Sequence, residues 1–147
     1  MVWGAMSAYG PGPLYRVVNS MNGKQYKTVL DEVMLPYAYS TFGNNFIFQQ
    51  DNAPCHTSNL LKEWFEGKDV QKLTWPPQSP DLSPIENLWK DVGLGLRDYK
   101  LSNLDDLWKA IQTIWFNIPA QRCEALVNSL PRRLKACSQA YGGHTKY

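Results

Sequence analysis

Residues 75–89 read WPPQSPDLSPIENLW, a proline-rich approach followed by the start of a helix. Ser83 is a good N-cap residue, Pro84 suits the first helical position, and Glu86 stands three residues after the cap, as in a capping box. The preceding prolines stiffen the approach. The stretch therefore predicts a helix that starts at Pro84 and carries Glu86 in its first turn. Its apolar stripe consists of Ile85, Leu88, Trp89, Val92 and Leu96.

A second stretch, FQQDNAPCH over residues 48–56, places another acid at the end of an apolar run. Residues 46–48 are typical of a short buried strand, and the asparagine and proline after Asp51 favour a turn. Ligands of α/β sheets usually bind at the carboxyl ends of strands. Asp51 and Glu86 are separated by 34 residues, enough for a helix, a strand and a rigid loop that bring the chain back. The two carboxylates are therefore candidate ligands of a divalent metal ion.

Each candidate also has an ordinary structural explanation. Glu86 could complete the capping box by accepting a hydrogen bond from the amide of Ser83. Asp51 could instead close an Asx turn at the end of its strand. Asn52 and His56 are candidates for residues that orient an acid, a water or a phosphate beside Asp51. For His56, local hydrogen bonds within a loop are the alternative.

The rest of the chain predicts one α/β domain with a helical C-terminal end. An antiparallel hairpin is expected at the start, with its turn at Tyr9–Pro13. A helix over residues 22–35 should end at Pro36, because proline breaks the backbone hydrogen-bond ladder. Further elements are expected as a helix over residues 58–65, a strand over 70–75, and helices over 104–116, 119–129 and 131–141.

Size and composition fit one ordinary domain with a real core, since the chain has 147 residues of which 44% are hydrophobic. Its three cysteines are scattered, which favours reduced intracellular thiols over disulfides or a zinc site. No apolar run reaches the roughly 18 residues of a membrane span and no leader is visible, so we expect an unsecreted protein without a membrane partner.

Positive charge is concentrated near the C-terminal end. The net charge is +2, yet residues 121–147 hold five basic side chains and one acidic side chain. Arg132, Arg133 and Lys135 could contact phosphates of a polyanion in a salt-dependent manner. A solvated basic helix end is the alternative.

Five phrases, in order along the chain, resemble the catalytic domain of transposases of the Tc/mariner superfamily. The resemblance covers essentially the whole chain, and the order of the phrases makes it specific. They are VWG at 2–4, QQDNAPCH at 49–56, WPPQSPDLSPIENLW at 75–89, PRRL at 131–134 and GGHTKY at 142–147.

The resemblance implies a ribonuclease-H-like fold, a mixed sheet flanked by helices, with a triad of two aspartates and a third acid. Asp51 matches the second acid and Glu86 the third. The first acid belongs to a strand upstream of residues 2–4 in the family, so residues 1–147 are expected to form a single partial DDE catalytic domain that lacks this strand and the N-terminal DNA-binding region. Asp31, which precedes Asp51, is expected to be a solvated helix charge rather than the first acid.

The resemblance also implies a cofactor, partners and a compartment. Two Mg²⁺ ions, with Mn²⁺ as a substitute, would support DNA cleavage and strand transfer at transposon ends. The expected partners are transposon-end and target DNA, with self-association and no small-molecule substrate, in the nucleus. Without its first acid, the isolated chain is expected to bind metal weakly and to be inactive. The rival hypothesis is a non-catalytic DNA- or protein-binding remnant.

Overall fold

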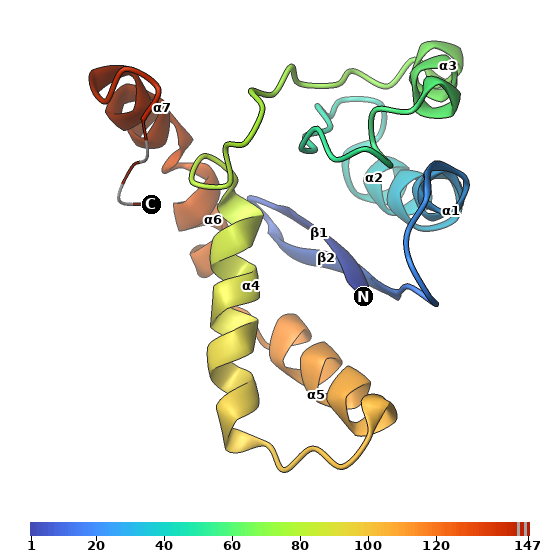
Figure 1. The fold of residues 1–147 in the computed structure, drawn as a ribbon, viewed down its shortest axis with the longest axis vertical. Helices are drawn as coiled ribbons and strands as arrows, with labels where there is room; N and C mark the ends of the chain where they lie inside the picture. Colours follow the sequence, from blue (N-terminus) through green and yellow to red (C-terminus); the bar gives the residue numbers. More distant parts are fainter. Residues whose placement is uncertain (144, 146) are drawn as a thin grey trace. The chain divides into compact units, whose positions relative to one another are not determined.

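The computed structural model describes residues 1–143, 145 and 147, so His144 and Lys146 of the last family phrase lie outside the described residues. The chain divides into two compact units. The first unit comprises Met1–Gly4 and Tyr15–Ser79, and the second comprises Ala5–Leu14 and Pro80–Tyr147. The elements are drawn in Figure 1, and each unit is described by itself.

The chain starts with the expected hairpin of two paired strands, β1 (Val2–Ser7) and β2 (Gly10–Arg16). The predicted turn at Tyr9–Pro13 was too long, since β2 already begins at Gly10, whose φ of 134° favours glycine. Pro11 and Pro13 are two residues apart, so their missing N–H groups fall on the same edge of the strand.

The first helical segment of the first unit continues past the predicted stop at Pro36. It consists of α1 (Gly23–Val29), the π-helical turn η1 (Leu30–Met34) and α2 (Leu35–Phe42). The amide of Leu35 donates to the carbonyl of Leu30, five residues back. This wider turn makes room for the ring of Pro36, which in a regular helix would meet the carbonyl four residues earlier.

Aromatic and aliphatic side chains from α1, η1, α2 and α3 (Asn59–Lys68) form the core of the first unit. The strands expected at 46–48 and 70–75 meet in one parallel bridge, Phe48 with Lys72. The Phe48 amide donates to the Gln71 carbonyl at 2.8 Å, and the Leu73 amide donates to the Phe48 carbonyl at 2.9 Å. Asp51 follows three residues later, as expected. The core side chains include Tyr26, Leu30, Met34, Leu61, Trp64 and Phe65.

The second unit is mainly helical, as expected. Figure 1 shows α4 and α5 as a helical hairpin joined by residues 96–103. Trp115 of α5 is buried, stacks on Trp89 of α4 with ring centroids 4.8 Å apart, and donates from Nε1 to the Gly12 carbonyl at 2.8 Å. In the part of the chain that is described, no helix is long and apolar enough to cross a membrane. The elements are α4 (Pro84–Gly95), η2 (Leu96–Asp98), α5 (Leu104–Phe116), α6 (Ala120–Val127) and α7 (Leu130–Gln139).

Candidate active site

The carboxylate of Asp51 is held at one oxygen and open to solvent. Oδ1 accepts a hydrogen bond from the Ala53 amide at 3.1 Å and lies 2.6 Å from Nδ1 of His56. The Asx-turn alternative for Asp51 is therefore formed. The side chain of Asp51 is nevertheless 62% exposed, against 17% for His56. A fixed but accessible carboxylate is a suitable hard-oxygen donor for a divalent cation.

His56 is fixed in turn by groups that reach into the core. Its ring packs on Tyr26 with centroids 4.0 Å apart, and its carbonyl accepts from Nε2 of Gln50 at 3.2 Å. The hydroxyl of Tyr26 donates to Oε1 of Gln50 at 2.7 Å. Burial raises the pKa of Tyr26 above its ordinary range, so the hydroxyl remains a donor at neutral pH. A chain of contacts thus connects the core of the first unit to Asp51.

Tyr26 and Gln50 were not among the residues that the sequence indicated. Gln50 stands directly before Asp51 in the QQDNAPCH phrase, which was a usable signal. Tyr26 lies within the helix expected over residues 22–35, and no feature of the sequence pointed to a hydroxyl partner 24 residues away.

Asn52 ties the Asp51 loop to the neighbouring chain segment. Its Nδ2 donates to the carbonyl of Trp75 at 2.7 Å. Together with the bridge between Phe48 and Lys72, this bond joins the two segments of the first unit at a second point. Asn52 thus helps to position the Asp51 loop.

Glu86 is an exposed residue in the first turn of α4. Its amide donates to the Ser83 carbonyl at 3.3 Å. The reciprocal capping box, the structural alternative for Glu86, is not formed, because the Ser83 side chain makes no capping hydrogen bond. The Ser83 amide donates to the Pro80 carbonyl at 3.0 Å. The buried side of α4 is formed by Leu88 and Val92, as the stripe predicted.

The three basic residues of α7 are placed differently from one another. Arg132 and Lys135 are exposed, as phosphate contacts require. Arg133 is 2% exposed and donates to Ser129 Oγ, the Asp81 carbonyl and Asn87 Oδ1 at 2.7, 2.8 and 2.6 Å. Burial lowers its pKa. Because its donors are directed at protein oxygens, this placement contradicts the expectation that Arg133 contacts phosphates.

Asp31 pairs with two lysines and a tryptophan, instead of being the solvated helix charge that was expected. Its carboxylate accepts from Lys27 Nζ at 2.8 Å and from Trp64 Nε1 at 2.9 Å, and Lys68 Nζ lies 3.3 Å away. Burial raises the pKa of Asp31, but the hydrogen bonds from these groups outweigh it and hold the pKa below its usual value. Asp31 therefore stabilises the packing of α3. Its carboxylate is engaged in these contacts and takes no part in the Asp51 loop.

The donor set for a metal ion is incomplete within each unit taken alone. Asp51 belongs to the first unit and Glu86 to the second. Among the described residues, no group of three His, Cys, Asp or Glu side chains could hold a metal ion. The carboxylate oxygens of these two residues are hard donors of the kind that Mg²⁺ and similar divalent cations prefer. A further oxygen donor is needed to complete a typical site.

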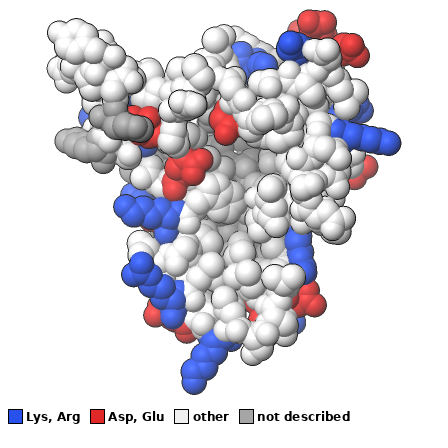
Figure 2. Space-filling model, viewed as in Figure 1, with Lys and Arg blue, Asp and Glu red and all other residues white. Residues whose placement is uncertain are grey.

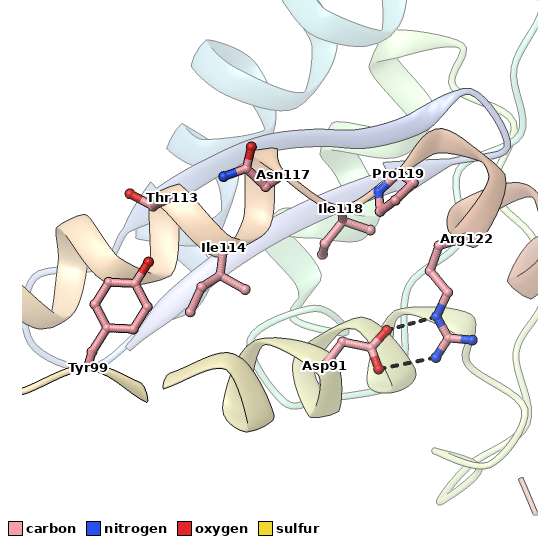
Figure 3. Close-up of a pocket in the computed structure, with 8 residues that line it drawn as sticks. All are labelled: Asp91, Tyr99, Thr113, Ile114, Asn117, Ile118, Pro119 and Arg122. Atoms are coloured by element: carbon pink, nitrogen blue, oxygen red, sulfur yellow. Dashed lines mark hydrogen bonds and ion pairs between the residues drawn. The ribbon is translucent and has the colours of Figure 1, made fainter. Parts of the chain in front are cut away.

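A groove of about 520 Å³ in the second unit has neither Asp51 nor Glu86 in its lining. Figure 3 shows the bidentate pair of Asp91 and Arg122 in it, with Nε–Oδ2 at 2.8 Å and Nη2–Oδ1 at 3.2 Å. The groove is lined by Asp91, Tyr99, Thr113, Ile114, Asn117, Ile118, Pro119 and Arg122.

On the face drawn in Figure 2, basic and acidic side chains are interspersed.

Known proteins similar in sequence to this chain are transposases. The chain is 42% identical to the Tcb2 transposase of Caenorhabditis briggsae over 147 residues, which is all of this chain and 54% of the relative. It is 40% identical to the Tc1 transposase of Caenorhabditis elegans over 147 residues, again 54% of the relative. The chain therefore spans about half the length of these relatives.

Solved structures show the fold. The catalytic domain of the Mos1 mariner transposase superposes with a TM-score of 0.86 at 19% identity, over 99% of this chain and 75% of that chain. A Mos1 strand transfer complex gives a TM-score of 0.85 at 20% identity, over 99% and 43%. The fold is thus ribonuclease-H-like, as expected.

A family model described as DDE superfamily endonuclease matches residues 1–108, which include both Asp51 and Glu86. Together with the transposase relatives, this match confirms the resemblance drawn from the five phrases. The chain belongs to the DDE superfamily of endonucleases.

Proposed function

We propose that Asp51 and Glu86 are two of the metal-binding acids of a site that cleaves DNA at transposon ends and transfers the cut strand. The observation that carries the proposal is the Asp51 carboxylate, which is fixed by His56 and the Ala53 amide, is 62% exposed and lies three residues after the bridge at Phe48. Membership of the endonuclease family supports it.

The proposed chemistry assigns each residue a physical task. Asp51 and Glu86 supply hard oxygen donors for Mg²⁺, for which Mn²⁺ can substitute. A bound divalent ion would neutralise charge at phosphorus and activate the attacking oxygen. With its proton on Nδ1, His56 donates to Asp51 and keeps that carboxylate in one orientation. Structures of the Mos1 catalytic domain with Mn and with Mg support the choice of metal.

We propose DNA as the partner, both as transposon ends and as target. Arg132 and Lys135 are three residues apart on α7, so they share a helix face that can approach phosphates. Binding through them should weaken as salt rises. The matched Mos1 complexes, which include a pre-cleavage transpososome and a strand transfer complex, support DNA as the substrate class. Self-association and a nuclear location follow from the same proposal.

The 147 residues alone are proposed to be inactive in transposition. Asp31, the aspartate that precedes Asp51, is engaged by Lys27, Lys68 and Trp64, so it does not supply a third acid beside Asp51 and Glu86. The rival function, a non-catalytic DNA- or protein-binding remnant, is favoured by the lack of a three-ligand cluster among the described residues.

Mn²⁺ titration by calorimetry separates the two functions. The proposal predicts weak binding that Asp51→Asn and Glu86→Gln each reduce by about tenfold, the effect of losing one charged ligand worth roughly 1.4 kcal/mol. Glu66→Gln and Glu124→Gln, exposed acids of α3 and α6, are the matched controls and should leave binding unchanged.

Equal Mn²⁺ binding by all four variants would favour the non-catalytic remnant.

A plasmid-nicking assay tests the proposed inactivity of the isolated chain. Mg²⁺- or Mn²⁺-dependent nicking that disappears in Asp51→Ala would overturn that part of the proposal.

A further inference from the structure

Arg133 joins the two chain segments on either side of Glu86. From α7 its Nη1 donates to the Asp81 carbonyl, in the approach to α4, and its Nη2 donates to Oδ1 of Asn87, the residue after Glu86. Nε is anchored on Ser129 Oγ, whose own hydroxyl donates to the Leu126 carbonyl at 2.6 Å. One rigid guanidinium therefore sets the distance between the approach and the first turn of α4.

Burying the Arg133 guanidinium among neutral oxygens requires a large desolvation free energy. An apolar side chain of similar size often gives a protein equal or greater stability. The three bonds of Arg133 are directional, so they specify where the bonded groups lie. The contacts of Arg133 are therefore better explained by the geometry that they impose than by a gain in stability.

A second layer of contacts holds the same approach. The Thr145 hydroxyl donates to Oδ2 of Asp81 at 2.8 Å. The ring of Tyr147 lies 5.1 Å from Cζ of Arg133, in cation–π range. Asp81 is thus held through its carbonyl by Arg133 of α7 and through its carboxylate by Thr145.

The start of α4 depends on such external ties. Its N-cap residue Ser83 forms no side-chain cap, and Pro84 has no amide to donate. We propose that Arg133 is a positioning residue, which together with Thr145 and Tyr147 fixes the first turn of α4 and so holds the Glu86 carboxylate in place. The role of Glu86 as a ligand rests on the proposed function, whereas the fixing of the turn does not.

Amide hydrogen exchange of the full 147-residue chain tests the fixing. Arg133→Met should speed exchange at residues 86–89 by about tenfold relative to residues 92–95 of the same helix, because charge-assisted bonds to the first turn are lost. Leu126→Ala, a core change in the same unit, should lower protection along α4 uniformly. Arg132→Met, at the exposed neighbour, should change neither region.

Two further variants keep the test decisive if Arg133→Met does not fold. Arg133→Lys retains a charge but cannot reach Asp81 and Asn87 together, so residues 86–89 should still lose protection selectively. Thr145→Val removes only the outer tie and should give a smaller change in the same residues. A uniform change along α4 in both variants would overturn the positioning role.

A metal readout distinguishes positioning from general stability. In Mn²⁺ titrations followed by amide line broadening, Arg133→Lys should weaken broadening at Glu86 at least threefold and leave Asp51 as in the unmodified chain. Equal broadening at Glu86 in both proteins would overturn the inference. If the unmodified chain shows no broadening at Asp51 or Glu86, the proposed function fails, and the exchange comparison still decides whether Arg133 fixes the turn.

Discussion

Replacing Tyr26 by phenylalanine tests the contacts behind Asp51. The hydroxyl that would be lost donates to Gln50 Oε1 at 2.7 Å, and the two residues are 1% and 9% exposed. The remaining ring keeps its packing on His56, so the change isolates one hydrogen bond. A buried acceptor left without its donor destabilises a protein by roughly 1–3 kcal/mol. We expect Tyr26→Phe to lie within this range.

Urea unfolding followed by tryptophan fluorescence measures the effect. Tyr39→Phe, at an exposed tyrosine of α2, is the matched control and should change stability by less than about 0.5 kcal/mol. Gln50→Met removes the other partner. The double variant should be more stable than the sum of the two single effects predicts, because it leaves no hydroxyl facing an apolar group and no orphan acceptor at this contact.

Two results would refute this reasoning. One is a Tyr26→Phe effect no larger than that of the control, which would mean that the bond to Gln50 does not contribute. The other is strict additivity of Tyr26→Phe and Gln50→Met, which would mean that the two side chains do not act as a pair.

Other predictions concern pH and helix glycines. Burial raises the pKa of Tyr26, so its protonated hydroxyl stabilises the fold fully below its ordinary pKa of 10.0, and this stability is lost as pH rises above that value. The free energy of unfolding should therefore fall less steeply with alkaline pH in Tyr26→Phe than in the unmodified chain. An identical pH dependence in the two proteins would contradict this. The pKa of Asp31 is held below its ordinary 3.8, so its charged carboxylate stabilises the fold above that pH, and this stability is lost as pH falls below it. Asp31→Asn should remove this acid-sensitive part of the free energy of unfolding. An unchanged dependence of that free energy on acidic pH would contradict the prediction. Gly93→Ala in α4 should stabilise by up to about 1 kcal/mol in urea unfolding, since a Cβ there meets nothing within 4 Å. Gly95→Ala should gain less, because its Cβ would lie 3.1 Å from Ile114, so equal gains would refute the packing argument.

Elements with complete local signals were predictable from the sequence. The helix at Pro84 follows from a cap residue, a proline and an apolar stripe that all act within a few residues, and its start was confirmed. The helix at Leu104–Phe116 was confirmed for the same reason. The position of Asp51 after the Phe48 strand also follows from local turn chemistry.

Features that depend on distant partners were missed. Pro36 does not end its helix, because a π turn with its own packing in the core accommodates the ring. Arg133 looked like a surface cation beside Arg132, and only the fold reveals the oxygens of Asp81 and Asn87 that bury it. The hydroxyl of Tyr26 likewise acquires its role through a partner far along the chain.

We propose that Asp51 and Glu86 bind a common divalent metal ion. The most direct test of this proposal is an anomalous difference map from crystals of the chain grown with Mn²⁺. We predict a Mn²⁺ peak roughly 2 Å from carboxylate oxygens of both residues. Peaks that contact only other acids, or a map in which the two carboxylates bind no common ion, would contradict it.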